Sequence, residues 1–514
     1  MYYFVTSWYG DQGKWASPNK YWYYEQRKME FDDSVNQVKM FTLTNNHCEL
    51  LVLNYYPQLR NFMHRQGIYA VPYHNFFDEL QGIDSNLIRK ISFRDLNWPQ
   101  GTDFRYTPFN VWAFKDEEVL AYIEFTDEGN LNVIDWQLNG RTDHTYIFDD
   151  RGFLSSIRYY TADGNEWYQD YFDLAGQKQF RQYFNGQGVD IFPGANCDFA
   201  KQHYQDMDEV LAERIQVFSH QHLSPKDTVV VTANKRHNDL FVGQVPAKLA
   251  LSFFNNRYDL TDEDQLTKLL DQVDLAVAAS TKEAAQLKRL AQTTQVVEVT
   301  PFDTRLEIGK SQQTEYLKLL YWLGDQTDEE IVEALAALVA LATKFPKLAL
   351  KFASYRSEEE RIKTLVENYL AENDLEEEFC FGEPKFDPTD IDNLELEQKE
   401  VKVIDFLEVK SERDLVSELE FTRLIVDLGS EPDLFLQIAG ISAGIPQINK
   451  VPSTYIEAGK NGLVVADIAG LTQAVTYYFD GLKNWNRAMM YAVNKIMDYT
   501  SGKLVAKWKE LLGD

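Results

Sequence analysis

The stretch Gly440-Ile-Ser-Ala-Gly444 matches the GxSxG pattern, in which a nucleophilic serine stands at a sharp turn between a strand and a helix. Two features oppose a hydrolase. Residues 430–433 are typical of a helix N-terminus, so Ser442 is expected inside a helix over 434–442. The hydrolase order also places the histidine after the serine, whereas all eight histidines precede residue 238. We therefore interpret the two glycines as positions of close helix packing.

Other patterns for metal or cofactor binding are absent or incomplete. His220-Gln-His222 offers two imidazoles on an expected strand, but no third ligand follows at a telling distance. No GxGxxG and no GxxxxGK[ST] occurs, which argues against dinucleotide and P-loop sites. The acidic stretch Glu372–Glu400 lacks the alternating ligands of a calcium loop and is expected to be a solvated face or loop. The three cysteines are widely separated without CxxC, which excludes a disulfide scaffold and a zinc ribbon: Cys48, Cys197 and Cys380.

The segment from Ser430 to Asp467 is expected to contain a strand end, a capped helix, the turn Gly444-Ile-Pro446, a short strand and the turn Asn461-Gly462. This order resembles the donor-nucleotide segment of retaining glycosyltransferases of the GT-B fold. In that family two carboxylates, eight positions apart, hold the nucleotide ribose and interact with the donor sugar. Glu431 occupies the first place, where it would also favour the helix dipole, but the second place is Ala439. Alanine can neither accept a hydroxyl hydrogen bond nor carry charge.

The diphosphate side of this degenerate donor site also departs from the family. The resemblance places an Arg and then a Lys after the first glycine-ended strand of the C-terminal domain. The corresponding stretch is Tyr321–Glu330, with Asp325 in the Arg position and the acidic residues 328–330 around the Lys position. Carboxylates there would repel a diphosphate that cations would attract. Arg305 and Lys310, on the preceding loop, are the alternatives that could restore binding.

Alternating strands and helices from about residue 225 onward predict parallel sheets with right-handed crossovers. A helix is expected to begin at the capping box Thr327-Asp-Glu-Glu330. We expect an N-terminal Rossmann-like domain from residues 1–99 and 194–290, and a C-terminal one from 296–483. Residues 484–514 are expected to form a helix that crosses back between the domains. Expected strands include 228–232, 276–278, 295–300, 318–324, 348–352, 401–406 and 423–428.

Residues 100–193 show a different pattern, with turn glycines every 10 to 12 residues and aromatic, β-branched runs between them. This spacing predicts an antiparallel β-meander of six or seven strands, inserted in the first Rossmann-like domain. Such a sheet can leave one face solvated. Its aromatic residues either pack a core or form a docking face for a protein or a glycan. The candidate contacts are Trp136, Tyr159, Trp167, Tyr171 and Tyr183.

The composition excludes several classes of protein. The chain has 514 residues and a formal net charge of −29, which argues against nucleic acid or anionic lipid as the main partner. Apolar residues make up 44%, enough for large cores, so a disordered chain is excluded. The sequence contains no run of about 18 apolar residues, so no membrane span is predicted. The N-terminus lacks the features of a signal peptide. We therefore expect a cytoplasmic location.

Several long stretches resemble the first of the accessory secretory proteins of the accessory Sec system of Gram-positive bacteria. This resemblance covers nearly the whole chain and implies a GT-B-like protein without transferase activity. It further implies assembly with two sister accessory secretory proteins, and export of glycosylated serine-rich-repeat adhesins through an accessory motor ATPase and its membrane channel. The matching stretches are FDDSVNQVKMF (31–41), LVLNYYPQLRNFMHRQ (51–66), FRDLNWP (93–99), YIFDDRGFLSSI (146–157) and LFLQIAGISAGIPQIN (434–449).

Together these observations predict an α/β, GT-B-like, non-catalytic adaptor that needs no cofactor or metal. Its expected partners are the two sister proteins, the motor ATPase and the glycosylated adhesin preprotein, with attachment to the inner face of the membrane only through partners. Two alternatives stay open. One is an active retaining glycosyltransferase that recruits Glu431, Arg305 and Lys310 for a nucleotide-sugar donor. The other is a lectin-like module that binds glycans.

Overall fold

The computed structural model describes residues 1–10, 15–17, 32–84, 88–305, 308–382 and 402–513. The chain forms two compact units. The first contains Met1–Gln26, Phe41–Val277 and Gln286–Val297, and the second contains Arg27–Met40, Ala278–Ala285 and Glu298–Asp514. Most of the acidic stretch 372–400 lies outside the described residues.

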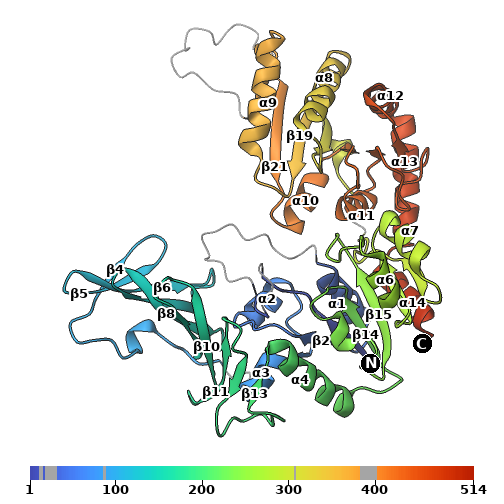
Figure 1. The fold of residues 1–514 in the computed structure, drawn as a ribbon. Coiled ribbons are helices and arrows are strands. Elements are labelled where there is room, and N and C mark those ends of the chain that lie inside the picture. Colours follow the sequence, from blue (N-terminus) through green and yellow to red (C-terminus); the bar gives the residue numbers. More distant parts are fainter. Residues whose placement is uncertain (11–14, 18–31, 85–87, 306–307, 383–401, 514) are drawn as a thin grey trace. The chain divides into compact units, whose positions relative to one another are not determined.

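A parallel sheet forms the core of the first unit (Figure 1). Its central strands β1 and β14 are buried along their whole length, as their continuous apolar runs predict for a sheet covered on both faces. The strand order is β17-β16-β15-β14-β1-β2-β3. The strands are β1 (Tyr2–Val5), β2 (Cys48–Val52), β3 (Tyr73–Asn75), β14 (Thr228–Thr232), β15 (Lys248–Phe253), β16 (Leu275–Ala278) and β17 (Gln295–Glu298). The helices of this unit are α2 (Leu59–Arg65), α3 (Phe76–Leu80), α4 (Met207–His222), α5 (Asn238–Phe241) and α6 (Glu263–Leu270), whereas α1 (Asp33–Leu43) and α7 (Thr281–Leu290) are divided between the two units.

A ten-stranded antiparallel sheet is inserted in the same unit, after α3 and before α4. The expected number of six or seven strands is therefore too low, because the short strands at both ends lack the regular glycine turns that mark the central hairpins. Its strands, in sequence order, are β4 (Asp103–Tyr106), β5 (Val111–Lys115), β6 (Glu118–Phe125), β7 (Leu131–Leu138), β8 (Arg141–Asp149), β9 (Phe153–Tyr160), β10 (Glu166–Phe172), β11 (Lys178–Tyr183), β12 (Val189–Ile191) and β13 (His203–Tyr204).

Buried charges join this antiparallel sheet to α2 and α3. Arg60 on α2 pairs with Asp149 at 2.9 Å, and Arg151 pairs with Asp78 on α3 at 2.7 Å. The Tyr171 ring stacks on Phe180 with centroids 4.2 Å apart. Buried ion pairs of this kind are costly to break, because the partner left behind is an uncompensated charge. The inserted sheet is thus an integral part of the first unit.

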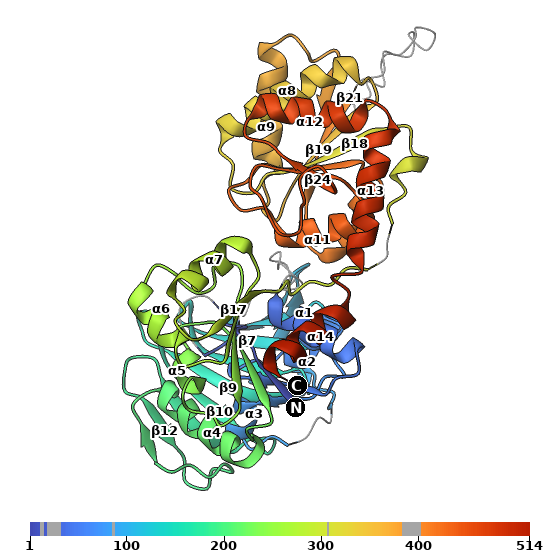
Figure 2. The same cartoon turned by 90° about the vertical axis from the view of Figure 1, so that its right-hand side faces the viewer.

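The second unit is built on another parallel sheet, of order β20-β21-β19-β18-β22-β23-β24. Helices α8, α9 and α12 pack beside one another (Figure 2). The strands are β18 (Leu317–Trp322), β19 (Leu348–Ser354), β20 (Phe379–Phe381), β21 (Lys402–Glu408), β22 (Leu424–Asp427), β23 (Gln447–Asn449) and β24 (Gly462–Val464). The helices are α8 (Asp328–Lys344), α9 (Glu359–Glu372), α10 (Glu412–Leu419), α11 (Leu434–Ala443), α12 (Ile468–Phe479), α13 (Leu482–Ile496) and α14 (Ser501–Leu512).

The structure confirms the predicted α/β class, with two parallel sheets and an inserted antiparallel sheet. The capping box at Thr327 and Glu330 is present and starts α8. Two local expectations were wrong. His220-Gln-His222 ends helix α4 rather than lying on a strand. The C-terminal stretch forms two helices, because Thr500 caps a new helix by accepting a hydrogen bond from the Lys503 N–H.

Candidate functional site

The carboxyl ends of β18 and β22 meet where the strand order of the second sheet reverses. β19 follows β18 on one side, while β22 lies on the other side of β18. Ligands of open α/β sheets bind at such a point. Gly324 follows β18 in the left-handed conformation, with φ at 56°, and a Cβ there would lie 3.6 Å from the Gly429 Cα. The sheet thus brings together the two segments that the sequence assigns to a donor site.

A hydrogen-bonded pair joins the two loops that follow β18 and β22. The Ser430 N–H donates to Oδ1 of Asp325 at 2.9 Å, and the Ser430 hydroxyl donates to the other carboxylate oxygen. The hydroxyl bond is the main reason why the pKa of Asp325 lies below its usual range. A fixed carboxylate therefore occupies the place where the resemblance calls for an Arg.

Two carboxylates that the sequence analysis did not single out lie beside this pair, Asp427 buried and Asp433 partly buried. Asp427 ends β22 and accepts hydrogen bonds from the Gly429 N–H at 3.0 Å and the Asp433 N–H at 2.8 Å. Asp433 accepts from the Leu436 N–H at 2.7 Å, so it caps α11. Burial raises the pKa of Asp427 to about 7 and that of Asp433 to about 6. The signals available in the sequence were an acid directly after an apolar strand and another just before a helix.

Helix α11 explains the GxSxG stretch without a nucleophile. The Ser442 hydroxyl donates to the Ile438 carbonyl at 3.0 Å and lies inside the helix. A Cβ on Gly440 would come within 2.4 Å of the Gln447 side chain, so only glycine fits this contact. Gly444 ends the helix in the left-handed conformation, with φ at 72°. The Pro446 carbonyl, just beyond, accepts the Ile425 N–H at 3.2 Å and joins the sheet.

Both cations considered for the donor diphosphate, Arg305 and Lys310, face a carboxylate of the chain itself, and so do two further cations of the second unit. The first carboxylate position, Glu431, pairs with Lys282 at 2.5 Å, and both residues belong to the second unit. Ala439, the second position, is partly buried on α11. The remaining pairs are Arg305 with Glu412 at 4.0 Å, Lys310 with Glu420, Lys450 with Glu330 at 3.4 Å, and Arg361 with Asp328 at 2.8 Å.

A hollow of about 220 Å³ lies beside the N-terminus of α8 in the same unit. Its charged lining consists of Glu330, Glu333 and Asp467 with the single cation Lys450. Three carboxylates against one ammonium give this hollow a net negative charge, which repels a phosphate. The chemistry of this region therefore opposes a nucleotide diphosphate.

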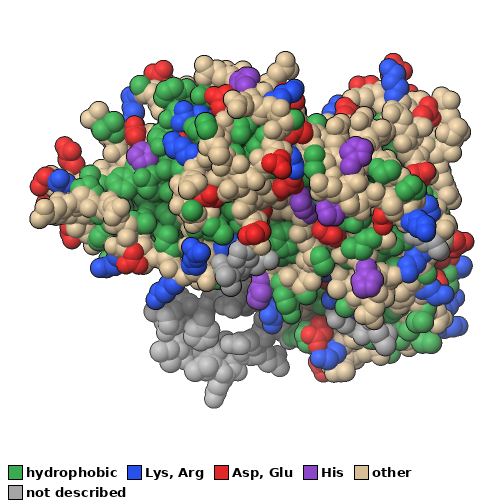
Figure 3. Space-filling model, turned by 90° about the horizontal axis from the view of Figure 1, so that it is seen from below, with side chains coloured by type: hydrophobic (Ala, Val, Ile, Leu, Met, Phe, Trp, Pro, Cys, Tyr) green, Lys and Arg blue, Asp and Glu red, His purple; other side chains and the backbone are tan. Residues whose placement is uncertain are grey.

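The aromatic residues proposed as contacts on the antiparallel sheet fall into two groups. Trp136, Tyr159 and Tyr183 are half-buried, and Trp167 is 44% exposed. Tyr171 is only 3% exposed, so it cannot serve as an outward contact; it packs between Tyr55 and Phe180 in the core of the first unit. Hydrophobic side chains gather on the surface of this sheet, at the left of Figure 3.

The half-buried rings form one row across neighbouring strands. Trp136, His144, Tyr159, Tyr168 and Tyr183 lie at directly opposed positions on β7 to β11. Tyr159 and Tyr168 stack with centroids 4.6 Å apart, and His144 stacks on both Trp136 and Tyr159. In a stacked pair the face of each ring lies against the neighbouring ring, so mainly the ring edges contact solvent. The row stiffens the sheet and offers little free ring face to a sugar.

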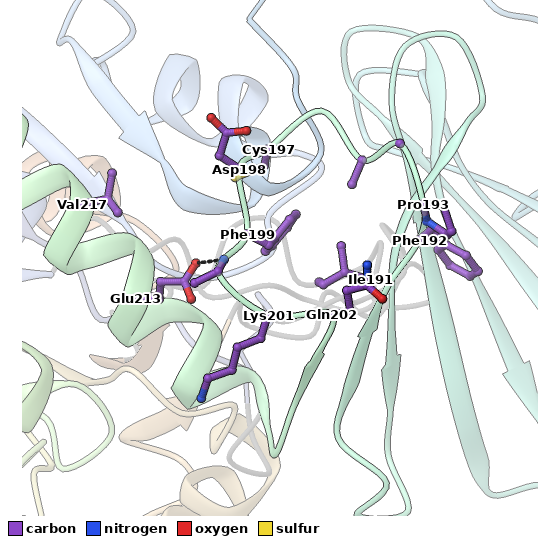
Figure 4. Close-up of a pocket in the computed structure, with 13 residues that line it drawn as sticks. Ile191, Phe192, Pro193, Cys197, Asp198, Phe199, Lys201, Gln202, Glu213 and Val217 are labelled. Carbon is purple, nitrogen blue, oxygen red and sulfur yellow. Dashed lines mark hydrogen bonds between the residues drawn. The ribbon is translucent and has the colours of Figure 1, made fainter.

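An open hollow of about 500 Å³ lies between the loop after β12 and helix α4 (Figure 4). Its carboxylate Glu213 already accepts hydrogen bonds from the Ala200 N–H at 3.0 Å and the Tyr204 hydroxyl at 2.7 Å. Cys197 is a lone thiol whose pKa is raised by burial to about 11, which leaves it protonated and unreactive near neutral pH. We assign no ligand to this hollow.

The two parallel α/β sheets define the class of protein as a GT-B-type glycosyltransferase scaffold. A pneumococcal O-GlcNAc transferase, GtfA, solved with UDP and GlcNAc, has the same fold. The TM-score is 0.71 over 100% of this chain and 98% of that one, at 13% sequence identity. At that identity the likeness establishes the fold alone.

The chain belongs to the family of accessory secretory protein 1 of the accessory Sec system. The model of this family matches residues 1–514. The accessory Sec system protein of this family from Streptococcus gordonii is 34% identical, over 100% of this chain and 99% of the relative. A chain in the Glycosylation Associate Protein (Gap123) complex from Streptococcus agalactiae is 36% identical, with a TM-score of 0.81 over 99% of both chains. A chain from the structure of accessory secretory proteins 1, 2 and 3 of Streptococcus pneumoniae is 29% identical, with the same TM-score of 0.81 over 100% of this chain and 99% of that one.

Within the part of the chain that the structure describes, no helix is long and apolar enough to cross a membrane. The same residues contain no group of three or more His, Cys, Asp or Glu arranged to hold a metal ion.

Proposed function

We propose that this chain is a non-catalytic, GT-B-like subunit of an accessory Sec export system. The observation that carries the proposal is the Asp325–Ser430 pair, because it holds a carboxylate where the family resemblance calls for a diphosphate-binding Arg. The second sugar-binding carboxylate is replaced by Ala439. A donor site without an electrostatic partner for the developing negative charge on the leaving diphosphate would lack what is usually the largest single contribution to catalysis.

The family supports the remaining parts of the proposal. One relative with a TM-score of 0.81 comes from a Glycosylation Associate Protein (Gap123) complex, and another comes from the crystal structure of accessory secretory proteins 1, 2 and 3. We infer that this chain likewise assembles with two sister proteins in the cytoplasm and aids export of a glycosylated serine-rich-repeat adhesin through the accessory motor ATPase. Attachment to the inner face of the membrane would then occur through these partners.

Calorimetric titration with a panel of uridine-diphosphate sugars tests the catalytic alternative. We expect no binding tighter than millimolar, because the carboxylates around Asp325 repel the diphosphate and Ala439 offers no hydrogen bond to the sugar. An active glycosyltransferase of the same fold, titrated under the same conditions, is the positive control. Micromolar binding that Glu431→Ala abolishes would overturn the proposal, since it would show that the donor carboxylate still works.

A further inference from the structure

Strand β4 is the outermost strand of the antiparallel sheet and pairs only with β5 among the described residues. In Figure 1 the β4–β5 hairpin lies at the far end of this sheet. The opposite edge, β13, is only two residues long, and the chain then enters α4. The edge at β4 therefore presents the longer open row of main-chain groups, and such a row is a template for another strand.

The hydrogen bond from the Thr107 N–H to the Asn110 carbonyl, at 2.9 Å, fixes which groups of β4 face outward. Hydrogen-bonded and non-hydrogen-bonded pairs alternate along an antiparallel ladder. Arg105, opposite Trp112, is therefore bonded to β5, whereas Phe104 and Tyr106 oppose Ala113 and Val111 in non-bonded pairs. The main-chain N–H and C=O groups of Phe104 and Tyr106 consequently point to the open edge.

The side chains hold β4 in place but do not cover this edge. Phe104 packs against Phe93 and Trp98, with ring centroids 5.1 and 5.3 Å away, so the strand is anchored on one face. Tyr106 is 62% exposed and Phe109, in the adjacent turn, is 54% exposed. The strand contains no proline and its pairing with β5 has no bulge, so two common devices for blocking an edge are missing, although it is short and carries the charged residues Asp103 and Arg105. A pre-formed, uncovered edge costs little to bind.

We propose that the open edge of β4 binds an extended segment of one of the two sister proteins as an added strand. This inference rests on the proposed assembly. The occupant follows from the chemistry of the edge: N–H and C=O groups that repeat every second residue are matched by an extended polypeptide, not by a sugar or a nucleotide. Because β4 has four residues, the added strand supplies one part of a larger interface.

Proline at position 106 removes the outward N–H without touching the ladder to β5, and proline is tolerated at such positions on edge strands. Tyr106→Val is the matched control, because it also loses the phenol ring but keeps the N–H. We expect Tyr106→Pro to weaken assembly with the sister proteins at least tenfold relative to Tyr106→Val, about the effect of one unpaired hydrogen-bonding group. Both variants should unfold at the same temperature as each other.

Hydrogen exchange in the wild-type assembly gives a second readout at single amides. The N–H groups of Phe104 and Tyr106 should exchange rapidly in the free chain and slowly in the complex, whereas Arg105 is protected in both. Equal assembly of the two variants, or rapid exchange at 104 and 106 within the complex, would overturn the edge proposal. Failure of the wild-type chain to assemble at all would instead overturn the proposed function.

Discussion

At the scale of single residues, the proposed donor site contains carboxylates that accept hydrogen bonds from the chain itself. Asp325 takes the hydrogen bonds of Ser430, and Asp427 takes two main-chain N–H groups of the following loop. The same kind of N–H groups bind phosphate in working sites of parallel sheets. Internal anions thus occupy donors that a nucleotide would need, which would give the proposed loss of nucleotide binding a cause in addition to charge repulsion.

Asp433 gives a testable pH dependence. Its folded pKa of about 6 lies above the value of about 3.9 in an unfolded chain, so its contribution to stability is complete below pH 4 and is lost as the pH rises through 6. Asp433→Asn keeps an N-cap acceptor but cannot ionise. We expect the fall in free energy of unfolding between pH 4 and 6 to become shallower in this variant, as measured by urea denaturation at each pH.

Asp467→Asn is the control for that measurement, because Asp467 caps α12 at an exposed position. Its profile should follow the wild type. If Asp433→Asn showed the same slope as the wild type, the carboxyl group would not be held neutral by burial.

Gly440 offers a second test at this scale. A Cβ there would lie 2.4 Å from Nε2 of Gln447 and 2.8 Å from Cδ1 of Ile425, both buried. Gly440→Ala should therefore lower the free energy of unfolding by roughly 1–3 kcal/mol, the usual cost of overpacking. Gly502→Ala, on α14 with open space around the added Cβ, should be neutral or slightly stabilising. Equal denaturation midpoints for both variants would contradict close packing at Gly440.

At the scale of elements, the sequence predicted what depends on local pattern. The run Thr228–Thr232 is apolar and β-branched and forms β14 as expected. β15 was missed because Lys248–Phe253 mixes a lysine, an alanine and a serine into the apolar run, although five of its six residues are buried. The pair Asp325–Ser430 lay beyond prediction, because its partners are 105 residues apart and meet only through the order of β18 and β22.

For the aromatic residues of the antiparallel sheet, the local pattern likewise could not predict which side chains are exposed. A period of two tells which side chains share a face, but not where that face is covered. Tyr171 and Trp167 are both on β10, yet only Tyr171 lies against the core of the first unit. A register shift between Glu166 and Tyr168 further breaks the alternation at Trp167. Removing residues 100–193 would strip Tyr171 and Phe180 from this core, so point variants test docking more cleanly than a deletion.

At the scale of the whole molecule, added salt should act in opposite directions on two contributions to stability: the repulsion from the net charge of −29 and the attraction within ion pairs. Excess like charge destabilises a compact chain through self-repulsion, and salt screens it. Salt also weakens surface ion pairs, but each contributes only about 0–1 kcal/mol. We therefore expect the melting temperature to rise when sodium chloride increases from about 0.02 to 0.3 M, a range over which the Debye length falls several-fold.

Sodium chloride is preferred to sulfate, which strengthens apolar burial by a different mechanism. A melting temperature that fell over this range would show that the favourable surface pairs, such as Arg65–Asp127, outweigh the repulsion.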